Sequence, residues 1–425
     1  MPELRPFRGL RYNDDIAGNI ALNVAPPYDI IYDEWRERLY ERSPFNIIRL
    51  IKTKDLPGEA FPDAKYSHAA GDIADWMKRG VLRLDDRPCI YLRSDTYKVD
   101  GELKTRFGFI ALLKIEEFGR SVHPHERTLS APKADRLKLV KATKTNLSQI
   151  FSIFRDTEGD IQSIIDAVAQ TIPSVEFVDE QDITRRMWVI DDPKTIGMLT
   201  DLMKDRDIII ADGHHRYETA LTYREFMESQ RESDREPFDY VSMYFSNADA
   251  PGMTVLPTHR KVSEVSTYNQ NTFFTELAKL FDVTYYGPAD YRELLRSIAV
   301  GAESNNRYVV YTCDGFGTAT MKDTPSPKDL DVDILHSVII EKLLGISRED
   351  IASGKHVHFC KSPEHAVEDV VNHKDQISFL MNPVTPDELF RTVLKGVRMP
   401  QKSTYFYPKT MSGLVMYLID RESIS

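Results

Sequence analysis

The clearest pattern of apolar and polar positions lies in residues 206–226, "RDIIIADGHHRYETALTYREF". The three isoleucines at 208–210 are typical of a short strand buried on both faces of a sheet. Before this run, apolar residues recur at helical spacing from Asp192-Pro193, a helix-start signal. After it, helical spacing begins again at residue 214. We therefore expect a helix, a buried strand, a tight turn at Gly213 and a second helix. The second helix is expected to bury Tyr217, Ala220, Leu221 and Met227.

Similar patterns predict the elements on either side. Residues 1–60, which include two adjacent prolines, favour short strands and turns. Two β-rich runs around Asp100-Gly101 predict a hairpin, as does the region 174–190. Helices are expected at 66–80, 133–145, 271–281, 332–345, 363–373 and 386–396, and further strands at 238–245, 253–262, 307–313, 356–360, 376–381 and 412–419. This alternation predicts a mixed α/β (α+β) fold.

Length and composition predict a globular protein of several domains. At about 150 residues per domain, 425 residues correspond to two or three domains. We expect a mixed α/β region at 1–130, a core at 131–265 and an α/β domain at 266–425. The chain is 41% apolar and 28% charged, so it can bury a sizeable core.

The net charge indicates which ligands the protein can bind, and the cysteine content indicates the cellular compartment. A net charge of −11 argues against a broad nucleic-acid surface, which binds mainly by neutralising phosphates, and favours small anions as ligands. The N-terminus is charged from its third residue, and no stretch approaches the ~18 apolar residues that cross a bilayer, so we expect no membrane association. Three distant cysteines disfavour a disulfide framework and favour the cytoplasm.

The polar residues "DGHHR", 212–216, lie where the buried strand turns into the helix. The first turn of such a helix offers backbone N–H groups and the positive end of its dipole, and Gly213 lets a ligand approach closely. Arg216 can grip a phosphate with two hydrogen bonds. His214 and His215 can exchange hydrogen bonds near neutral pH, and Asp212 can bind a metal or accept a proton. The pattern predicts a phosphate site; the alternative is that the histidines cap the helix and Arg216 pairs with a nearby carboxylate.

The turn by itself accounts for binding and not for catalysis. A helix terminus stabilises an anion by about 0.3–2 kcal/mol, whereas enzymes lower barriers by about 8 kcal/mol or more. Phosphoryl transfer also needs a carboxylate to activate the hydroxyl, a metal and further cations. The segment 121–136, "SVHPHERTLSAPKADR", offers a base in Glu126 and cations in Arg127, Lys133 and Arg136. The alternative is an exposed loop followed by a solvated basic helix face.

Three later segments offer further polar candidates. "LPTHRK" places His259 and Arg260 at a strand end, and "QKST" presents Lys402; each is a source of anion donors or a polar edge loop. "KHVHFC" alternates two histidines and a cysteine on one strand face. Because a structural zinc site usually needs four ligands, we expect half-buried strand polarity there and not zinc.

The turn resembles that of the ParB/sulfiredoxin fold, in which Gly-x-x-Arg turns hold nucleotide phosphates. Gly213 and Arg216 match this glycine and arginine, while His214 stands where sulfiredoxins have a catalytic cysteine, so sulfinic-acid reduction is not implied. The free serine kinases of that fold share the Asp-Gly-His-His-Arg turn. Over nearly its whole length the chain resembles the family called domain of unknown function 1015, through "PFRGLRYN", "VAPPYDII", "SPFNIIRL", "HERTLSAPKADRLKL", "ADGHHRYETA", "VLPTHR" and "MPQKSTYFYPK".

The resemblance implies a ParB/sulfiredoxin-like core and a Mg²⁺-assisted phosphotransferase that uses ADP or ATP and acts on free serine or O-phosphoserine, in either direction. The backbone of 213–215 would bind phosphate, Arg216 would stabilise charge, Asp212 would hold the metal or act as a base, and Glu126 would activate the hydroxyl. An alternative is a non-catalytic nucleotide-binding switch of the ParB type. A ParB-like nuclease is disfavoured by the net negative charge.

Overall fold

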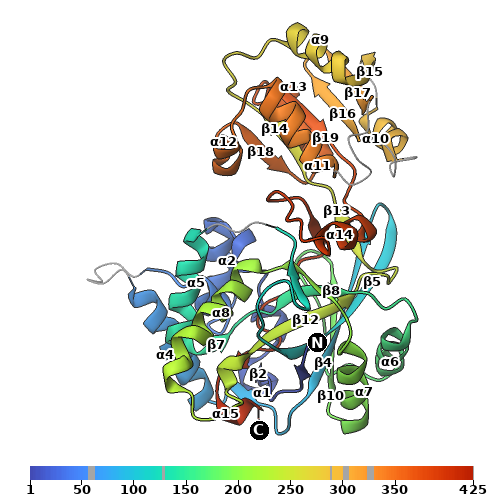
Figure 1. Ribbon diagram of the computed structural model, residues 1–425. Helices are drawn as coiled ribbons and strands as arrows, with labels where there is room; N and C mark the ends of the chain where they lie inside the picture. The colour runs from blue at the N-terminus through green and yellow to red at the C-terminus, as the bar shows by residue number, and fades with distance from the viewer. Residues whose placement is uncertain (56–62, 127–129, 288–289, 300–305, 323–329, 425) are drawn as a thin grey trace. The chain divides into compact units, whose positions relative to one another are not determined.

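The computed structural model describes residues 1–425 except 56–62, 127–129, 288–289, 300–305, 323–329 and 425. The chain divides into two compact units. The large unit comprises Met1–Pro124, Thr128–Met253 and Pro408–Ser425, and the small unit comprises His125–Arg127 and Thr254–Tyr407. The element order confirms the expected mixed α/β fold (Figure 1). The boundaries of these two units differ from those of the expected regions 1–130, 131–265 and 266–425. The three expected regions stay a prediction.

A nine-stranded mixed sheet forms the centre of the large unit, with the strand order β6-β11-β8-β12-β5-β4-β10-β9 and β1 paired to β5. The bounds are β1 (Leu4–Arg5), β4 (Ile90–Val99), β5 (Glu102–Lys114), β6 (Val122–Pro124), β8 (Ile150–Phe154), β9 (Val175–Val178), β10 (Thr184–Ile190), β11 (Ile208–Asp212) and β12 (Tyr240–Asn247). Both predicted hairpins are present, one joining β4 to β5 at Asp100-Gly101 and one joining β9 to β10. Because β11 lies between β6 and β8, its isoleucines are buried as expected.

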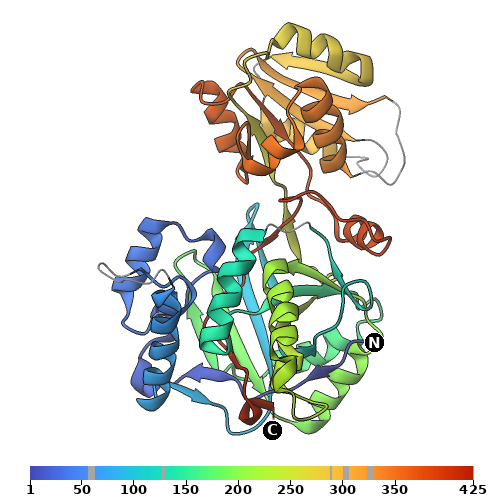
Figure 2. The same ribbon diagram turned by 60° about the vertical axis from the view of Figure 1, so that its left-hand side comes forward.

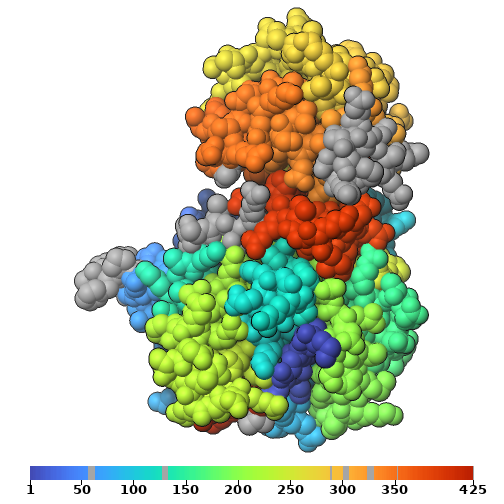
Figure 3. All heavy atoms as spheres, in the orientation of Figure 1, coloured from blue at the N-terminus to red at the C-terminus, as the bar shows by residue number. Residues whose placement is uncertain are grey.

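Helices α6 (Asp160–Ala169), α7 (Pro193–Met203) and α8 (His214–Met227) bury an apolar core against one face of this sheet. Helix α5 (Ser130–Thr143) packs against α8 and α4 (Ala64–Lys78), as Figures 1 and 2 show. Strand β1, dark blue in Figure 3, lies beside α7. Helix α8 buries Tyr217, Ala220 and Leu221 as expected, but Met227 is only half-buried because it lies in the last helical turn.

The first 60 residues contain an unexpected helix, α2 (Asp33–Arg42). Its helical period is hard to recognise because only Trp35 and Leu39 are buried among many charged residues. The expected strand at 412–419 is reduced to β21, since Ser412 and Met416 make isolated bridges instead. The other regular elements of the large unit are β2 (Leu10–Tyr12), α1 (Asp14–Ala17), η1 (Ile20–Leu22), η2 (Tyr28–Ile30), α3 (Ile48–Ile51), β3 (Leu82–Leu84), β7 (Thr145–Asn146), η3 (Glu228–Gln230), η4 (Pro237–Asp239), β21 (Tyr417–Leu418) and α15 (Arg421–Ile424).

The opposite face of the nine-stranded sheet carries a buried polar cluster, because residues alternate between faces along β4, β5 and β10. Arg93, Arg106 and Arg185 all bond the carboxylate of the fully buried Asp95, at N–O distances of 3.0, 2.8 and 2.8 Å respectively. The same guanidinium groups donate to backbone carbonyls of Met411, Pro408 and Lys409. The cluster therefore fixes the segment 408–411 across the sheet.

The small unit contains a six-stranded antiparallel sheet with the order β15-β17-β16-β19-β14-β18. Strands β15 and β17 were not expected, and the helix expected at 332–345 is a short α-helix followed by a π-helix. The bounds are β13 (Thr254–Leu256), β14 (His259–Val262), α9 (Gln270–Leu280), β15 (Phe281–Gly287), α10 (Tyr291–Ala299), β16 (Arg307–Thr312), β17 (Gly315–Met321), α11 (Asp331–Ile334), η5 (Leu335–Leu343), α12 (Arg348–Ser353), β18 (Val357–Cys360), α13 (Pro363–Val371), β19 (Ile377–Leu380), α14 (Pro386–Val393) and β20 (Tyr405–Tyr407).

Candidate functional site

The turn between β11 and α8 has the geometry that the sequence predicts. Strand β11 ends at Asp212, and Gly213 takes up the left-handed conformation with φ +92° as the helix N-cap. Helix α8 begins at His214, so its first turn follows the strand without an intervening loop. A glycine is required here because a left-handed conformation is strained for other residues.

Arg216 folds back over this turn. Its Nη2 donates to Oδ2 of Asp212 at 2.7 Å, and its Nη1 donates to the backbone carbonyl of Gln149. A Cβ atom on Gly213 would lie 2.8 Å from the guanidinium, so the missing side chain makes room for Arg216. The carboxylate pairing that we considered as the alternative is therefore present. It holds the guanidinium at the turn, with donors in a geometry suited to an oxyanion.

Asp212 is held by two cations. Its Oδ1 accepts a hydrogen bond from Nζ of Lys409 at 2.7 Å, and its Oδ2 accepts the bond from Arg216. Burial disfavours the charged carboxylate, but Lys409 and Arg216 outweigh it and hold the pKa of Asp212 well below its usual range. A carboxylate with so low a pKa is a weak base, which favours a role as counter-ion or metal ligand over that of general base.

Lys409 was not among the preferred candidates from the sequence, where Lys402 was chosen from the same motif. The side chain of Lys402 is exposed and belongs to the small unit, whereas Lys409 belongs to the large unit together with Asp212. The signal available in the sequence was only that Lys409 ends the motif "MPQKSTYFYPK". Long-range packing of the segment 408–411 decides which lysine reaches the turn.

The two histidines of the turn lie in different surroundings. His214 is buried, and its charge contributes to the lowered pKa of Asp212. His215 is half-buried, and its backbone carbonyl accepts a hydrogen bond from the Thr219 hydroxyl.

Three of the sequence motifs meet at a small pocket of about 50 Å³, which is lined by Tyr28, Arg136 and Arg216 among others. The Arg136 guanidinium lies 4.1 Å from the ring centre of Tyr28 and donates to the carbonyl of Ile51 at 2.9 Å. Burial raises the pKa of Tyr28, and the charges of Arg136 and Arg216 oppose this rise. Tyr28 was missed as a site residue, although its motif "VAPPYDII" is one of those that carry the family resemblance.

The basic helix α5 is paired with neighbouring elements. Nζ of Lys133 lies 2.6 Å from Oε2 of Glu218 on α8, and Lys138 donates to Asp63 at 2.9 Å. Lys138, Lys141 and Lys144 are exposed, as expected for a solvated basic face, whereas Lys133 is half-buried against α8. Of the predicted cations on this segment, Arg136 reaches the small pocket, and Arg127 lies outside the described residues.

Three other predicted residues, Glu126, His259 and Arg260, belong to the small unit. Oε1 of Glu126 accepts the backbone N–H of Ser403 at 3.2 Å. His259 is buried and its Nδ1 accepts the N–H of Met381; burial and the charge of Arg260 lower its pKa to about 4. Arg260 is 1% exposed and donates to the carbonyl of Lys402 at 3.3 Å. Glu126 and the turn at 212–216 belong to different units, and the role of Glu126 as the general base stays a prediction.

Metal ligands are sparse in the described part of the chain, where no group of three or more histidine, cysteine, aspartate or glutamate side chains has the arrangement to hold a metal ion. Both oxygens of Asp212 accept hydrogen bonds from Lys409 and Arg216, and its role as a metal ligand stays a prediction. In the "KHVHFC" strand, His358 contacts the hydroxyl of Ser263 at 3.0 Å and Cys360 donates to the carbonyl of Ser362.

Among the described helices, none is long and apolar enough to span a membrane.

The fold and this turn define a mixed α/β protein with a polar strand-to-helix junction that contains a half-buried lysine–aspartate–arginine chain. Residues 4–337 match the model of the family described as "Protein of unknown function (DUF1015)", and the chain belongs to that family. The comparison with curated proteins finds no match.

Several solved structures are similar at a low level. A conserved hypothetical protein from Pyrococcus furiosus is 12% identical, with 71% of this chain and 93% of that chain covered and a TM-score of 0.35. A free serine kinase in complex with AMP is 12% identical, with 68% and 84% covered and a TM-score of 0.35. A C-terminally truncated SbnI from Staphylococcus aureus is 10% identical, with 73% and 87% covered and a TM-score of 0.35. Similarity of this size carries no argument about the present chain.

Proposed function

We propose that this protein is a nucleotide-dependent phosphotransferase that acts on free serine or O-phosphoserine. The observation that carries the proposal is the Asp-Gly-His-His-Arg turn, in which a left-handed Gly213 opens helix α8 and Arg216 lies over that glycine. A phosphate at this turn would meet backbone N–H groups, the positive end of the helix dipole and a guanidinium. The resemblance of the turn to that of the free serine kinases suggests the substrate class.

The charges around Asp212 suit a terminal phosphate of ADP or ATP. Lys409 and Arg216 together carry two positive charges against one carboxylate, so the group has a net charge of +1 to offer an anion. Arg216 uses two of its nitrogens for Asp212 and Gln149, and its guanidinium has five N–H donors in all, so donors remain for phosphate oxygens. Bound Mg²⁺ would neutralise charge that develops on the phosphates, with Asp212 as its protein ligand.

The small pocket lined by Tyr28 and Arg136 fits only part of a nucleotide. Its volume of about 50 Å³ is well below the ~300–1,000 Å³ typical of a whole-ligand site. Arg136 and Arg216 both line it, each paired with a carboxylate, Asp135 and Asp212 respectively. Phosphate oxygens would bind to guanidinium N–H groups there, and the base and ribose would bind outside the pocket. In the proposed reaction a general base takes the proton of the serine hydroxyl, whose oxygen then attacks the phosphorus as the bond to the nucleotide oxygen breaks. Glu126 is the candidate for this base from the sequence alone.

The proposal is tested by following phosphorus-31 signals of the full chain. One set of reactions contains Mg²⁺, serine and ATP or ADP, and the other contains Mg²⁺, O-phosphoserine and ADP. We expect a phosphoryl group to move in at least one set, and Arg216→Ala to slow the transfer by about 100-fold or more. Arg224→Ala, on the same helix but bonded to Ile115 and Glu117, is the matched control and should retain activity.

The competing function, a non-catalytic nucleotide switch, gives a different result in the same experiment. Nucleotide would then raise the melting temperature of the parent chain while no phosphoryl group moved in either set. That outcome would replace the enzyme proposal with the switch. An equal nucleotide-induced melting shift in the parent and Arg216→Ala chains would refute the assignment of the turn as the phosphate site.

A further inference from the structure

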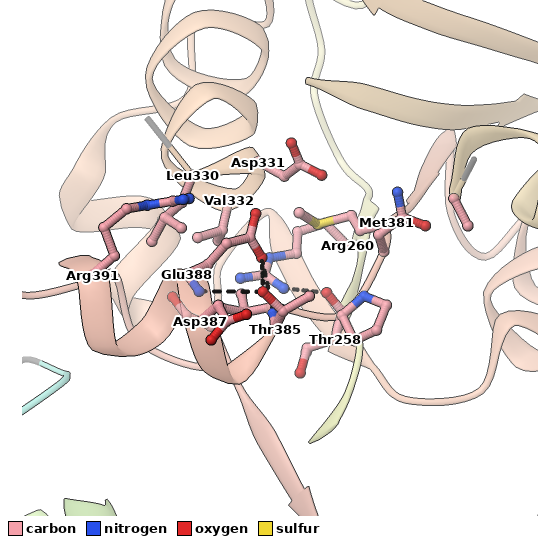
Figure 4. A pocket seen from close by; sticks show the side chains of 15 residues that line it. Thr258, Arg260, Leu330, Asp331, Val332, Met381, Thr385, Asp387, Glu388 and Arg391 are labelled. Atoms are coloured by element: carbon pink, nitrogen blue, oxygen red, sulfur yellow. Dashed lines mark hydrogen bonds between the residues drawn. The ribbon is translucent and has the colours of Figure 1, made fainter. Parts of the chain in front are cut away.

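The small unit contains a cavity of about 700 Å³ that the proposed reaction does not use. Its walls come from β14, α11, α14 and the segment that follows β19, and its lining includes Thr258, Arg260, Asp331, Met381, Glu388 and Ser403. Figure 4 shows Arg260, Asp331 and Glu388 projecting into this one cavity. The volume lies within the ~300–1,000 Å³ range of small-molecule sites.

Arg260 is a buried cation with only neutral hydrogen-bond partners. Its side chain donates from Nε to Nε2 of His336 at 3.1 Å, and from the two other nitrogens to the carbonyls of Thr258 and Lys402. Among the described residues, no carboxylate forms an ion pair with it. Burial lowers the pKa of Arg260 to about 9, and the charge of Glu126 offsets this only in part. Two of its five N–H donors remain for a ligand that lies in the cavity.

His336 holds this guanidinium as a neutral acceptor. Because its Nε2 accepts the proton of Arg260, the ring must carry its own proton on Nδ1. Burial and the charge of Arg260 lower the pKa of His336 to about 3, which agrees with a neutral ring. The histidine sits on the π-helix η5, a helix type that is rare and is often found at functional sites. His336 therefore holds the Arg260 guanidinium in place without neutralising its positive charge.

Three carboxylates also line the cavity, and two of them, Asp331 and Glu388, are half-buried. Asp331 accepts a hydrogen bond from Nδ2 of Asn306 at 2.8 Å, and Glu388 accepts the N–H and hydroxyl of Thr385 at the start of α14. Burial raises the pKa of Asp331 to about 6, and the neighbouring charge of Glu388 adds to the rise. A cationic ligand group would relieve the repulsion between these two carboxylates.

We propose that this cavity binds a free α-amino acid, with the carboxylate on Arg260 and the ammonium group on Asp331 and Glu388. The cavity supplies one buried cation without a carboxylate partner, Arg260, and two neighbouring half-buried carboxylates, which is the charge pattern that complements a zwitterion. Asp387 and Arg391 also line the cavity, but both are exposed. Its volume leaves room for a side chain beyond these two groups, next to the apolar Met381 and Val384. The inference does not rest on the proposed phosphotransfer, because the site lies wholly within the small unit.

The test is calorimetric titration of the full chain without nucleotide. The probes are L-serine, L-glutamate and O-phospho-L-serine, together with two truncated forms of serine: 3-hydroxypropanoate, which lacks the ammonium group, and ethanolamine, which lacks the carboxylate. We expect at least one amino acid to bind, and both truncated forms to bind at least about tenfold more weakly than serine or not at all. Equal binding of serine and 3-hydroxypropanoate would overturn the assignment of the ammonium site.

Variants separate this site from the phosphate turn. Asp331→Asn should weaken amino-acid binding by about tenfold or more, since a charged hydrogen bond is lost. Asp333→Asn, two residues away on the same helix and outside the cavity lining, is the matched control. Arg216→Ala should slow the proposed phosphotransfer but leave amino-acid binding unchanged, because Arg216 belongs to the large unit and does not line the cavity. The absence of binding by every amino acid tested, or equal binding by the parent and Asp331→Asn chains, would refute the proposal.

Arg260 provides a second, independent variant. Arg260→Gln keeps a hydrogen-bond donor for His336 or a carbonyl but removes the charge, and it should abolish binding of the carboxylate. Circular dichroism and the melting transition identify whether this variant folds. If it folds and still binds the amino acid with the parent affinity, the carboxylate assignment is wrong.

Discussion

Lys409 donates a hydrogen bond from Nζ to Oδ1 of Asp212 at 2.7 Å, although the two residues are 197 positions apart. Arg216 bonds the other oxygen of the same carboxylate. The lysine is carried there by a backbone segment that three buried arginines hold against the sheet. The turn at 212–216 and the segment 408–411 are therefore held together within the large unit.

We predict that Lys409→Met lowers the free energy of unfolding by about 1–3 kcal/mol, because a largely buried carboxylate then keeps one cationic partner instead of two. The pKa of Asp212 is lower in the folded state than in the unfolded state. The carboxylate therefore stabilises the fold when the pH is above the pKa of the unfolded state, and this stability is lost as the pH falls through the pKa of the folded state. Loss of Lys409 raises the folded pKa, so acid unfolding should begin at a higher pH. Urea unfolding between pH 3 and pH 7 measures both effects.

The matched control is Lys402→Met, which removes an exposed lysine of the same motif. Its unfolding free energy should stay within about 0.5 kcal/mol of the parent value. Identical losses for the two variants would show that the Asp212 contact does not stabilise the fold.

We predict that Gly213→Ala displaces Arg216. The new Cβ atom would lie 2.8 Å from the guanidinium, and a φ of +92° is strained for alanine. We expect a stability loss of about 1–3 kcal/mol and loss of the nucleotide-induced melting shift. Gly197→Ala is the control, because it lies inside helix α7 with open space around its Cβ position and should be neutral or stabilising by up to about 1 kcal/mol. A full nucleotide shift in Gly213→Ala would count against the site.

We predict that Asp95→Asn is among the most destabilising single changes in the large unit. Three fully buried arginines share this carboxylate, so its loss leaves buried positive charges without their counter-ion, at a cost of about 3–5 kcal/mol. The three arginines outweigh burial and hold the pKa of Asp95 well below its usual range, so this contribution should persist in acid down to about pH 4. Asp100→Asn, at the β4–β5 turn, is the control and should be nearly neutral. Equal urea midpoints for the two variants would contradict this account.

We predict that Asp331→Asn stabilises the ligand-free protein at pH 7.5 by about 1–3 kcal/mol. Burial raises the pKa of Asp331 to about 6. The contribution of this side chain to the free energy of unfolding is therefore most favourable when the carboxyl group is protonated, and it becomes unfavourable as the pH rises through the folded pKa. Asparagine removes the charge, and the gain should vanish below about pH 4, where the parent aspartate is protonated in both states. Urea unfolding of both chains at pH 4 and pH 7.5 measures the difference. A gain of the same size at both pH values would show that the ionisation of Asp331 is not its cause.

Local patterns were sufficient for the elements that carry strong periodicity. The isoleucine run, Gly213 and the following amphipathic pattern predicted β11, its turn and α8, because residues within a few positions of each other determine these features. The hairpin at Asp100-Gly101 follows from a turn signal of the same local kind. Helix α2 and the split of 332–345 into α11 and a π-helix were missed, since charged positions and tertiary packing override local propensity there.

The sequence by itself determined the mixed α/β class, the strand-turn-helix junction and the residue types able to hold a phosphate, because these depend on contacts between near neighbours. Only the tertiary structure decided that Lys409 and not Lys402 reaches Asp212, that Tyr28 and Arg136 share a pocket with Arg216, and that Arg260 lies buried against His336. These pairings join residues far apart in the chain. They depend on how distant segments of the chain pack against each other, which the pattern of neighbouring residues does not predict.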